Sequence, residues 1–278
     1  MADTLERSLT SILDQLDERF EVVIADDGSS DDSVKVIKSL QEKYPILRLM
    51  ELKRDSSRKL GLTRNMSIEE ARGEYVLLHL DCDDVWDPYL VDFTKAFHQI
   101  EQAAGKDILV SGVQVNIGKR SFLLKHGPYR NIFRGEDRDM WGRFAKMDAY
   151  IQFDHKRFMT RLPKNKKQKF TRTILYTWNH MENDFRAGES LKAFLHYESL
   201  RKNEMSLKLR ALRLLFSLPT YISSHFKEPI SKDNSFKCHK EFAAYRDKNR
   251  GNLIDILKRF GKEPDFSIFS STAEEIFK

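Results

Sequence analysis

The sequence predicts an α/β fold, in which a mostly parallel sheet with flanking helices is followed by a helical C-terminal region. Two observations support this prediction. Apolar segments with helical and strand-like spacing alternate over residues 3–80. Beyond residue 163, long basic and apolar stretches with helical spacing replace the short strand-like runs. We therefore expect two units, residues 1–163 and residues 164–278.

The first elements follow from apolar spacing. A helix is predicted at residues 3–16, because one face carries Leu5, Leu9, Ile12, Leu13 and Leu16. The next segments are a buried strand at 20–25, an Asp-rich turn at 26–32, a helix at 33–43, a strand at 46–52, a basic loop at 53–60 and a helix at 63–71. This alternation predicts parallel strands with helices on both faces of the sheet.

The stretch 73–88, GEYVLLHLDCDDVWDP, combines a strand with an acidic cluster. The apolar run 75–80 does not alternate, which is typical of a strand buried on both faces. Asp81, Asp83 and Asp84 follow at the carboxyl end, where open α/β sheets bind ligands. Close carboxylates repel one another unless a cation compensates, and Mg²⁺ or Mn²⁺ prefers oxygen ligands. We expect a divalent cation here; an acidic turn that caps the next helix is the alternative.

Composition indicates a soluble chain with a real core, since 40% of the 278 residues are hydrophobic and 32% are charged. The two cysteines, Cys82 and Cys238, form neither a disulfide framework nor a zinc motif, which is typical of a reducing compartment. The sequence contains no signal peptide and no run of 18 apolar residues. We therefore expect a cytoplasmic location.

Charge is distributed unevenly along the chain. Residues 1–154 hold 22 Lys+Arg and 28 Asp+Glu, whereas residues 155–278 hold 26 and 14, so the balance changes from −6 to +12. The basic part is either a solvated surface or a site for an anionic partner, such as a membrane surface or a phosphorylated substrate. No nucleic-acid-binding motif is found, so we expect no nucleic acid partner.

Four motifs occur in a fixed order: DDGSSDDS at 26–33, GLTRNMS at 61–67, the stretch 73–84, and GEDRDMWGR at 135–143. Together they resemble the inverting family 2 glycosyltransferases, which have the GT-A fold. The resemblance implies a hexosyltransferase-type enzyme that uses a nucleotide-sugar donor, Mn²⁺ or Mg²⁺, and a glycan or lipid-linked acceptor. Cell-surface polysaccharide biosynthesis is the process it implies.

The resemblance also implies roles for single residues on the donor side. Asp26 or Asp27 would contact the base or ribose of the nucleotide-sugar. Arg64 and Asn65 match the Arg-Asn pair that borders the nucleotide site. Asp81 and Asp83 match the D-x-D pair, with Asp83 expected as the more direct metal ligand.

On the acceptor side, Asp137 matches the general base and Glu136 would support it. The chemistry agrees, because a nucleoside diphosphate leaving group needs a cation and inversion needs one carboxylate near the attacking hydroxyl. The alternative for both residues is the N-terminal cap of a helix that starts near Arg138. His155 and His180 are candidates for a third metal ligand; a packed or exposed histidine is the alternative for each.

The sequence departs from the family pattern in two places. Ser67 stands where the family has glycine, which is a mild change. The family also begins with an apolar strand, whereas Met1-Ala2-Asp3 leads directly into the first helix. Loss of that strand would leave two neighbouring strands without backbone partners. The start is truncated, the sheet closes differently, or the chain is not a competent enzyme alone; a truncated start is our expectation.

The remaining segments complete the prediction: strands at 107–116 and 120–125, a turn at 127–130, a last strand at 149–153, helices at 170–186 and 189–203, and one or two helices with a loosely ordered end at 230–278. Residues 206–226 are apolar with interspersed basic residues. They either lie in an anionic membrane interface, which would make the protein peripheral on the inner membrane face, or pack on the first unit.

Two alternatives to an active glycosyltransferase remain open. The missing strand and the basic C-terminal part favour a catalytically incompetent, membrane-attached scaffold or binding relative of the same fold. A nucleotidyltransferase would also bind nucleotides on an α/β sheet, but no Gly-rich activating loop follows the first strand.

Overall fold

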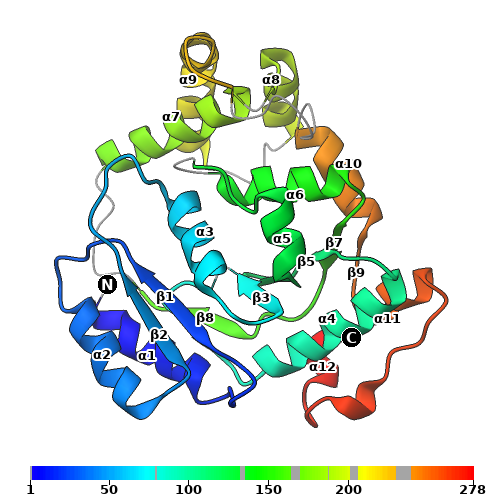
Figure 1. The fold of residues 1–278 in the computed structure, drawn as a ribbon. Coiled ribbons are helices and arrows are strands. Elements are labelled where there is room, and N and C mark those ends of the chain that lie inside the picture. Colours follow the sequence, from blue (N-terminus) through cyan, green and yellow to red (C-terminus); the bar gives the residue numbers. More distant parts are fainter. Residues whose placement is uncertain are drawn as a thin grey trace.

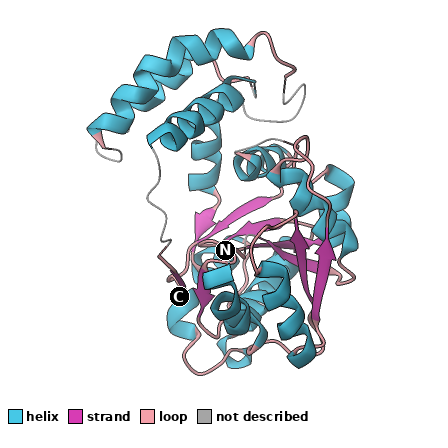
Figure 2. Cartoon of the chain, turned by 90° about the vertical axis from the view of Figure 1, so that its left-hand side faces the viewer, coloured by secondary structure: helices cyan, strands magenta, loops and turns pink. Residues whose placement is uncertain are grey.

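The computed structural model describes residues 2–78, 80–131, 135–163, 170–186, 188–200, 206–229 and 239–278. Figure 1 shows the helices α7, α8 and α9 gathered at the top of the view, with the strands and their flanking helices below. Figure 2, turned by 90°, shows the same division into a sheet-containing body and a layer of helices. The α/β fold with a helical C-terminal region is therefore confirmed.

The N-terminal part follows the predicted alternation. Its elements are α1 (Ala2–Leu13), β1 (Val22–Asp26), α2 (Ser33–Lys43), β2 (Leu47–Glu51) and α3 (Leu60–Glu70). The strands β1 and β2 pair in parallel. Buried leucines and isoleucines of α1, α2 and β2 form one apolar cluster: Leu5, Leu9, Leu13, Ile37, Leu40 and Leu47. The helical spacing in the sequence therefore identified the face that packs on these strands.

A second, five-stranded sheet has the order β3-β6-β5-β7-β9. Its strands are β3 (Tyr75–Leu78), β6 (Asn116–Lys119), β5 (Leu109–Ser111), β7 (Tyr150–Phe153) and β9 (Arg250–Gly251). The pairs β5–β7 and β7–β9 are parallel, whereas β3–β6 and β5–β6 are antiparallel. The short strands β4 (Asp84–Trp86) and β8 (Met159–Arg161) also pair antiparallel. The pairing is thus mixed, and the expectation of a mostly parallel sheet is wrong.

Two predicted strands have a different structure. The segment 107–116 is split, because the chain turns after Ser111 through Gln114, whose φ is 65°. The segment 120–125 belongs to the helix α5 (Arg120–His126). Its short apolar run is compatible with both helix and strand spacing, so tertiary contacts select the helix. The Arg120 guanidinium donates hydrogen bonds to the carbonyls of Ile68 and Glu69, at 2.9 and 2.7 Å.

The C-terminal segment returns to the sheet. After β9 come α11 (Leu253–Arg259), the 3₁₀ turn η1 (Phe266–Ile268) and α12 (Glu274–Phe277). Phe277 is fully buried and stacks on Phe153, with ring centroids 5.7 Å apart. These elements share a core with α4 (Leu90–Ala104). The expected loosely ordered end is therefore wrong, and β7 is not the last strand. The boundary at residue 163 stays a prediction, although residues 249–278 pack with the first unit.

The helical layer contains α7 (Phe170–Arg186), α8 (Leu191–Leu200) and α9 (Leu207–Ser224), and it is joined to the body next to α6 (Glu136–Lys146) and α10 (His239–Lys248). Aromatic contacts hold α9 to α7: the rings of Trp178 and Phe216 lie 5.5 Å apart, and those of Phe185 and Tyr221 lie 5.3 Å apart. One face of α9 is therefore packed, on helices rather than on the sheet. Among the described helices, none has the length and apolarity needed to traverse a bilayer.

The predicted basic run 164–169 and Cys238 lie outside the described residues, whereas Cys82 is a free, partly buried thiol.

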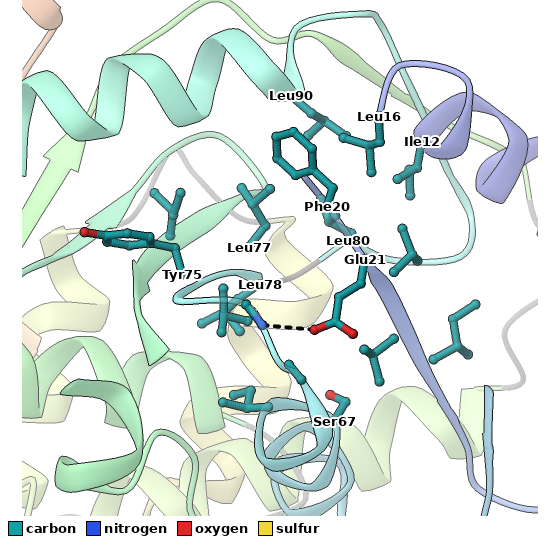
Figure 3. Close-up of a pocket in the computed structure, with 18 of the residues that line it drawn as sticks. Ile12, Leu16, Phe20, Glu21, Ser67, Tyr75, Leu77, Leu78, Leu80 and Leu90 are labelled. Carbon is teal, nitrogen blue, oxygen red and sulfur yellow. Dashed lines mark hydrogen bonds between the residues drawn. The ribbon is translucent and has the colours of Figure 1, made fainter. Parts of the chain in front are cut away.

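The two sheets do not join in the described residues. There β1 is hydrogen-bonded only to β2, and β3 only to β6. Between these strands lies an apolar cavity of about 290 Å³, which we call the slot; it is lined by residues of β1, β3, α1, α3 and α4. Figure 3 shows Ile12, Leu16 and Phe20 facing Leu77 across this space. The structure thus agrees with the expectation that two strands lack backbone partners.

The slot also corrects one prediction about β3. Tyr75, Val76 and Leu77 are only partly buried, so this strand is not covered on both faces along its length. At one end the slot is closed by Glu21, whose Oε1 accepts a hydrogen bond from the Gly73 amide at 3.0 Å (Figure 3).

Candidate functional site

A large open cleft of about 1440 Å³ lies where β1 and β3 end at their carboxyl sides. Six segments distant in sequence line it: the turn after β1, the loop before α3 with the start of α3, Asp81 after β3, the start of α6, Arg161 of β8, and one side of α7. Its charged side chains include Asp27, Arg58, Arg64, Asp81, Asp137 and Arg161. The cleft therefore collects residues from all four sequence motifs.

The two aspartates of the turn after β1, Asp26 and Asp27, have different surroundings. The Asp26 carboxylate is buried and accepts hydrogen bonds from the amides of Gly28 and Ser29, at 3.1 and 3.0 Å. Gly28 has a φ of 74°, and a Cβ there would lie 2.9 Å from Cβ of Arg54, so glycine is required. Asp27 instead lines the cleft, where it pairs with Arg58. Asp26 thus shapes the turn, and Asp27 faces the space a ligand would occupy.

Arg64 connects three of the motifs. Its Nη1 lies 2.8 Å from Oε1 of Glu136 and 2.6 Å from Oδ1 of Asp137, and its Nη2 lies 3.8 Å from Oδ1 of Asp81. The guanidinium also sits over the Tyr129 ring, 5.5 Å from its centroid. The guanidinium of Arg64 therefore holds together Asp81, which follows β3, and the two acidic residues at the start of α6.

The start of α3 reaches this position because Gly61 lacks a side chain. A Cβ at Gly61 would collide with the carbonyl oxygen of Arg130. Asn65 lies one residue after Arg64, and its amide brackets the backbone of Tyr129: Nδ2 donates to the carbonyl at 2.7 Å, and Oδ1 accepts from the amide at 3.0 Å. Asn65 thus fixes the turn that supports Arg64, and its predicted contact with nucleotide stays a prediction.

Glu136 and Asp137 form the first turn of α6, whose N-cap residue is Gly135. The helix therefore begins two residues before Arg138, and both carboxylates pair with Arg64. The Asp137 side chain is 34% exposed and lines the cleft, whereas that of Glu136 is only 6% exposed. Burial, together with the negative charge of Asp137, raises the pKa of Glu136 to about 7. Asp137 is thus the carboxylate that a ligand in the cleft would meet.

The acidic cluster after β3 converges on Arg161 of β8. The Nε and Nη2 atoms of Arg161 each lie 2.8 Å from one carboxylate oxygen of Asp84, and Nη2 lies 3.0 Å from Oδ2 of Asp81. Oδ2 of Asp83 lies 4.0 Å from Nε. The hydrogen bonds that Arg161 donates to Asp84 raise the pKa of Arg161 above its already high ordinary value. A cationic group therefore balances three neighbouring carboxylates.

The ligand chemistry of this cluster fits a divalent cation, because Asp81 and Asp84 present carboxylate oxygens to a single positive group. Within the described part of the chain, however, no three Asp, Glu, His or Cys side chains are arranged to enclose a metal. The Asp83 side chain is 3% exposed and lies outside the cleft lining. Asp81 and Asp83 as metal ligands stay a prediction, and of the two Asp81 faces the cleft.

The two candidate histidines lie in different places. His155 is not in the cleft: Phe93 and Phe158 pack against it, its Nε2 accepts from the amide of Val113 at 2.8 Å, and burial lowers its pKa to about 4. The packed alternative is therefore confirmed for His155. His180 of α7 does line the cleft, with its Nδ1 3.1 Å from Nη2 of Arg138.

Sequence reasoning missed several cleft residues. Arg54, Arg58 and Lys59 belong to the loop 53–60, whose basic composition was visible but carried no motif. Tyr176 comes from α7, far along the chain from the motifs. Arg161 lies in a three-residue strand, and nothing in its local sequence indicates that it meets Asp81 and Asp84.

Charged side chains of both signs therefore gather at the carboxyl ends of β1 and β3, where open α/β sheets bind ligands. The chain belongs to glycosyl transferase family 2, because the family model matches residues 2–160.

Similar proteins were found by sequence and by structure. An uncharacterized glycosyltransferase of Nostoc, alr2836, is 39% identical over 87 residues, which is 31% of this chain and 26% of that protein. The Escherichia coli UDP-Glc:alpha-D-GlcNAc-diphosphoundecaprenol beta-1,3-glucosyltransferase WfaP is 30% identical over 84 residues, 30% of this chain and 32% of that protein. This chain therefore matches about a quarter to a third of these relatives.

Among solved structures, the mannosyltransferase PcManGT from Pyrobaculum calidifontis, in complex with GDP-Man and Mn²⁺, is similar with a TM-score of 0.48 and 17% identity. The similarity covers 81% of this chain and 70% of that chain.

Proposed function

We propose that this chain transfers a sugar, with inversion, from a nucleotide-sugar donor to a glycan or lipid-linked acceptor, and that a divalent cation takes part. The observation that carries the proposal is the position of Arg64, which joins Asp81 to Glu136 and Asp137 in one cleft. Membership of glycosyl transferase family 2 supports it.

The cleft suits a nucleoside diphosphate. Arg54, Arg58, Lys59 and Arg64 all line the cleft, so several cations border a space large enough for the donor. Asp27 lies on the β1 side, where a carboxylate accepts hydrogen bonds from ribose hydroxyls or base nitrogens.

The proposed chemistry is a single displacement. The acceptor hydroxyl attacks the anomeric carbon, the bond from that carbon to the diphosphate oxygen breaks, and Asp137 takes the hydroxyl proton. Arg64 holds Asp137 in place, and the raised pKa of Glu136 lowers the total negative charge of the pair near neutral pH. Asp81 and Asp83 would hold a Mn²⁺ or Mg²⁺ ion, which offsets charge on the leaving diphosphate.

The direct test is donor hydrolysis and transfer by residues 1–278 with a panel of nucleotide-sugars and Mn²⁺. Release of a nucleoside diphosphate from one donor, abolished by EDTA and restored by Mn²⁺, is the expected result. Absence of both binding and hydrolysis for every donor would contradict the proposal.

We further propose that α9 places the enzyme on an anionic membrane surface at the cytoplasmic face. The outer side of α9 and the residues after it expose large apolar side chains: Leu207, Leu214, Leu215, Leu218, Ile222 and Phe226. Exposed Lys208 lies within this stripe and Lys227, which pairs with Glu182, follows it; basic residues beside an apolar surface favour anionic head groups. WfaP, whose name gives a diphosphoundecaprenol acceptor, supports a membrane location for the acceptor.

Co-sedimentation with vesicles that contain phosphatidylglycerol tests this surface. Leu215→Glu combined with Leu218→Glu is expected to abolish binding, whereas Ile268→Glu, which changes an exposed residue of η1, is expected to leave it intact. Equal binding by all three proteins would contradict the assignment to α9.

One observation favours a second function, that of a non-catalytic scaffold or binding relative. The slot separates β1 from β3 directly beside the cleft, since Arg64 and Asp81 line both spaces. A chain that binds a nucleotide-sugar with Mn²⁺ but neither hydrolyses nor transfers it would support this second function.

A further inference from the structure

Arg161 of β8 lies at the centre of the acidic cluster that follows β3. Its guanidinium occupies the position at which Asp81 and Asp84 converge, with three nitrogen–oxygen distances of 2.8, 2.8 and 3.0 Å. The Asp84 side chain is completely buried, and that of Asp83 nearly so, whereas the Arg161 side chain is 47% exposed. A half-exposed arginine thus balances two carboxylates that are shielded from water, Asp83 and Asp84, and one that faces the cleft, Asp81.

Such an arrangement needs a cation at all times. Buried carboxylates without a compensating charge are costly, so Arg161 cannot leave unless another cation takes its place. A divalent cation held by Asp81 and Asp83 would lie where the guanidinium now lies, since Nη2 of Arg161 is 3.0 Å from Oδ2 of Asp81 and Nε is 4.0 Å from Oδ2 of Asp83. Arg161 and a metal ion therefore compete for the Asp81 carboxylate in this geometry.

The surroundings of Arg161 offer it a second position. Arg161 lines the cleft together with Arg54, Arg58 and Arg64, of which Arg58 and Arg64 are paired with carboxylates. A guanidinium binds two phosphate oxygens as readily as two carboxylate oxygens, because both present the same paired geometry. With a diphosphate in the cleft, Arg161 has an anionic partner outside the acidic cluster.

We propose that Arg161 gates the cation site: it holds Asp81 while the cleft lacks a nucleotide, and it exchanges this carboxylate for the diphosphate when a divalent cation enters. This inference rests on the proposed function. It makes the binding of Mn²⁺ and of a nucleoside diphosphate mutually dependent, and this coupling is reciprocal. Arg161 is thus a positioning residue that sets the order of assembly.

The test measures Mn²⁺ binding without any sugar transfer. Free Mn²⁺ is quantified by electron paramagnetic resonance during titration of the chain, alone and with UDP or GDP. In the unaltered protein the nucleoside diphosphate is expected to tighten Mn²⁺ binding by about tenfold or more, the upper part of the usual range of coupling. In Arg161→Gln, Mn²⁺ alone is expected to bind about tenfold more tightly than to the unaltered protein.

Arg250→Gln is the matched control, because Arg250 pairs with Asp154 at 2.6 Å, outside the cleft lining, and its loss should not change Mn²⁺ binding. If Arg161→Gln fails to fold by circular dichroism, Arg161→Lys replaces it: the ammonium keeps a charge but loses the bidentate pair, and tighter Mn²⁺ binding is again expected.

The outcomes separate the two proposals. Two results would overturn the gate and leave the proposed function standing. In the first, the chain binds nucleotide, but its Mn²⁺ affinity is the same in the presence and absence of the nucleotide. In the second, the Arg161 variants bind Mn²⁺ with the same affinity as the unaltered protein. Binding of neither UDP, GDP nor a nucleotide-sugar overturns the proposed function itself.

Discussion

The slot and the cleft share Arg64 and Asp81 but are built on opposite principles. Leucine, isoleucine and valine side chains line most of the slot, and two strands approach there without pairing in the described residues. Ion pairs hold the walls of the cleft, and three motifs meet there at Arg64. The charged site is therefore held together by ion pairs between side chains, although β1 and β3 beside it are not hydrogen-bonded to each other in the described residues.

The largest expected effect concerns chemistry in the cleft. Asp137→Asn removes the exposed carboxylate that would take the acceptor proton while keeping its shape. Transfer is expected to fall by about 10²–10⁴-fold, with donor affinity within a few-fold of the unaltered protein. Single-turnover transfer and calorimetry measure the two quantities.

Asp148→Asn provides the control, since Asp148 pairs with Lys106 away from the cleft. If Asp137→Asn retains full transfer activity, another base is used and the assignment is wrong.

The next effect compares the slot with the core directly. Leu109 in β5 is completely buried, whereas Leu77 in β3 is partly buried and lines the slot. Leu109→Ala is expected to lower the free energy of unfolding by about 2–5 kcal/mol, because it opens a new cavity. Leu77→Ala enlarges an existing space and is expected to cost roughly half as much or less. Urea unfolding measures both, and equal losses would mean that the slot is filled in solution.

The smallest effect is a dependence of stability on pH. Burial and Asp137 raise the pKa of Glu136 from 4.5 to about 7 in the folded state, so the folded chain binds this proton more tightly than the unfolded chain does. The stabilisation is complete below about pH 4.5 and is lost as the pH rises through about 7. Glu136→Gln is expected to flatten this part of the curve of unfolding free energy against pH. An unchanged curve would show that Glu136 titrates normally.

The sequence predicted the parts of the molecule that depend on local pattern. The helical faces of α1 and α2, the turn at Asp26 and the position of Asp137 at a helix start all follow from short-range spacing. Short apolar runs were predicted wrongly. The segment that forms α5 is compatible with both strand and helix spacing, and the hydrogen bond from Arg120 to the Ile68 carbonyl is a tertiary contact that local spacing does not reveal.

Long-range contacts were not accessible from spacing. Arg161 lies 77 positions from Asp84, and only the pairing of β4 with β8 brings the two together. The return of β9 and α12 to the sheet was missed for the same reason, because the two-residue β9 pairs with β7 from almost 100 positions away and carries little local pattern.

The most direct test of the central claim is calorimetric titration of the chain and of Arg64→Gln with UDP and GDP in the presence of Mn²⁺. The account predicts that one of these ligands binds the unaltered chain and that Arg64→Gln weakens its binding by at least about tenfold, since Arg64 joins Asp81 to Glu136 and Asp137 in the cleft. Equal affinity of the two proteins would contradict the account, because the ligand would then bind elsewhere than in the cleft.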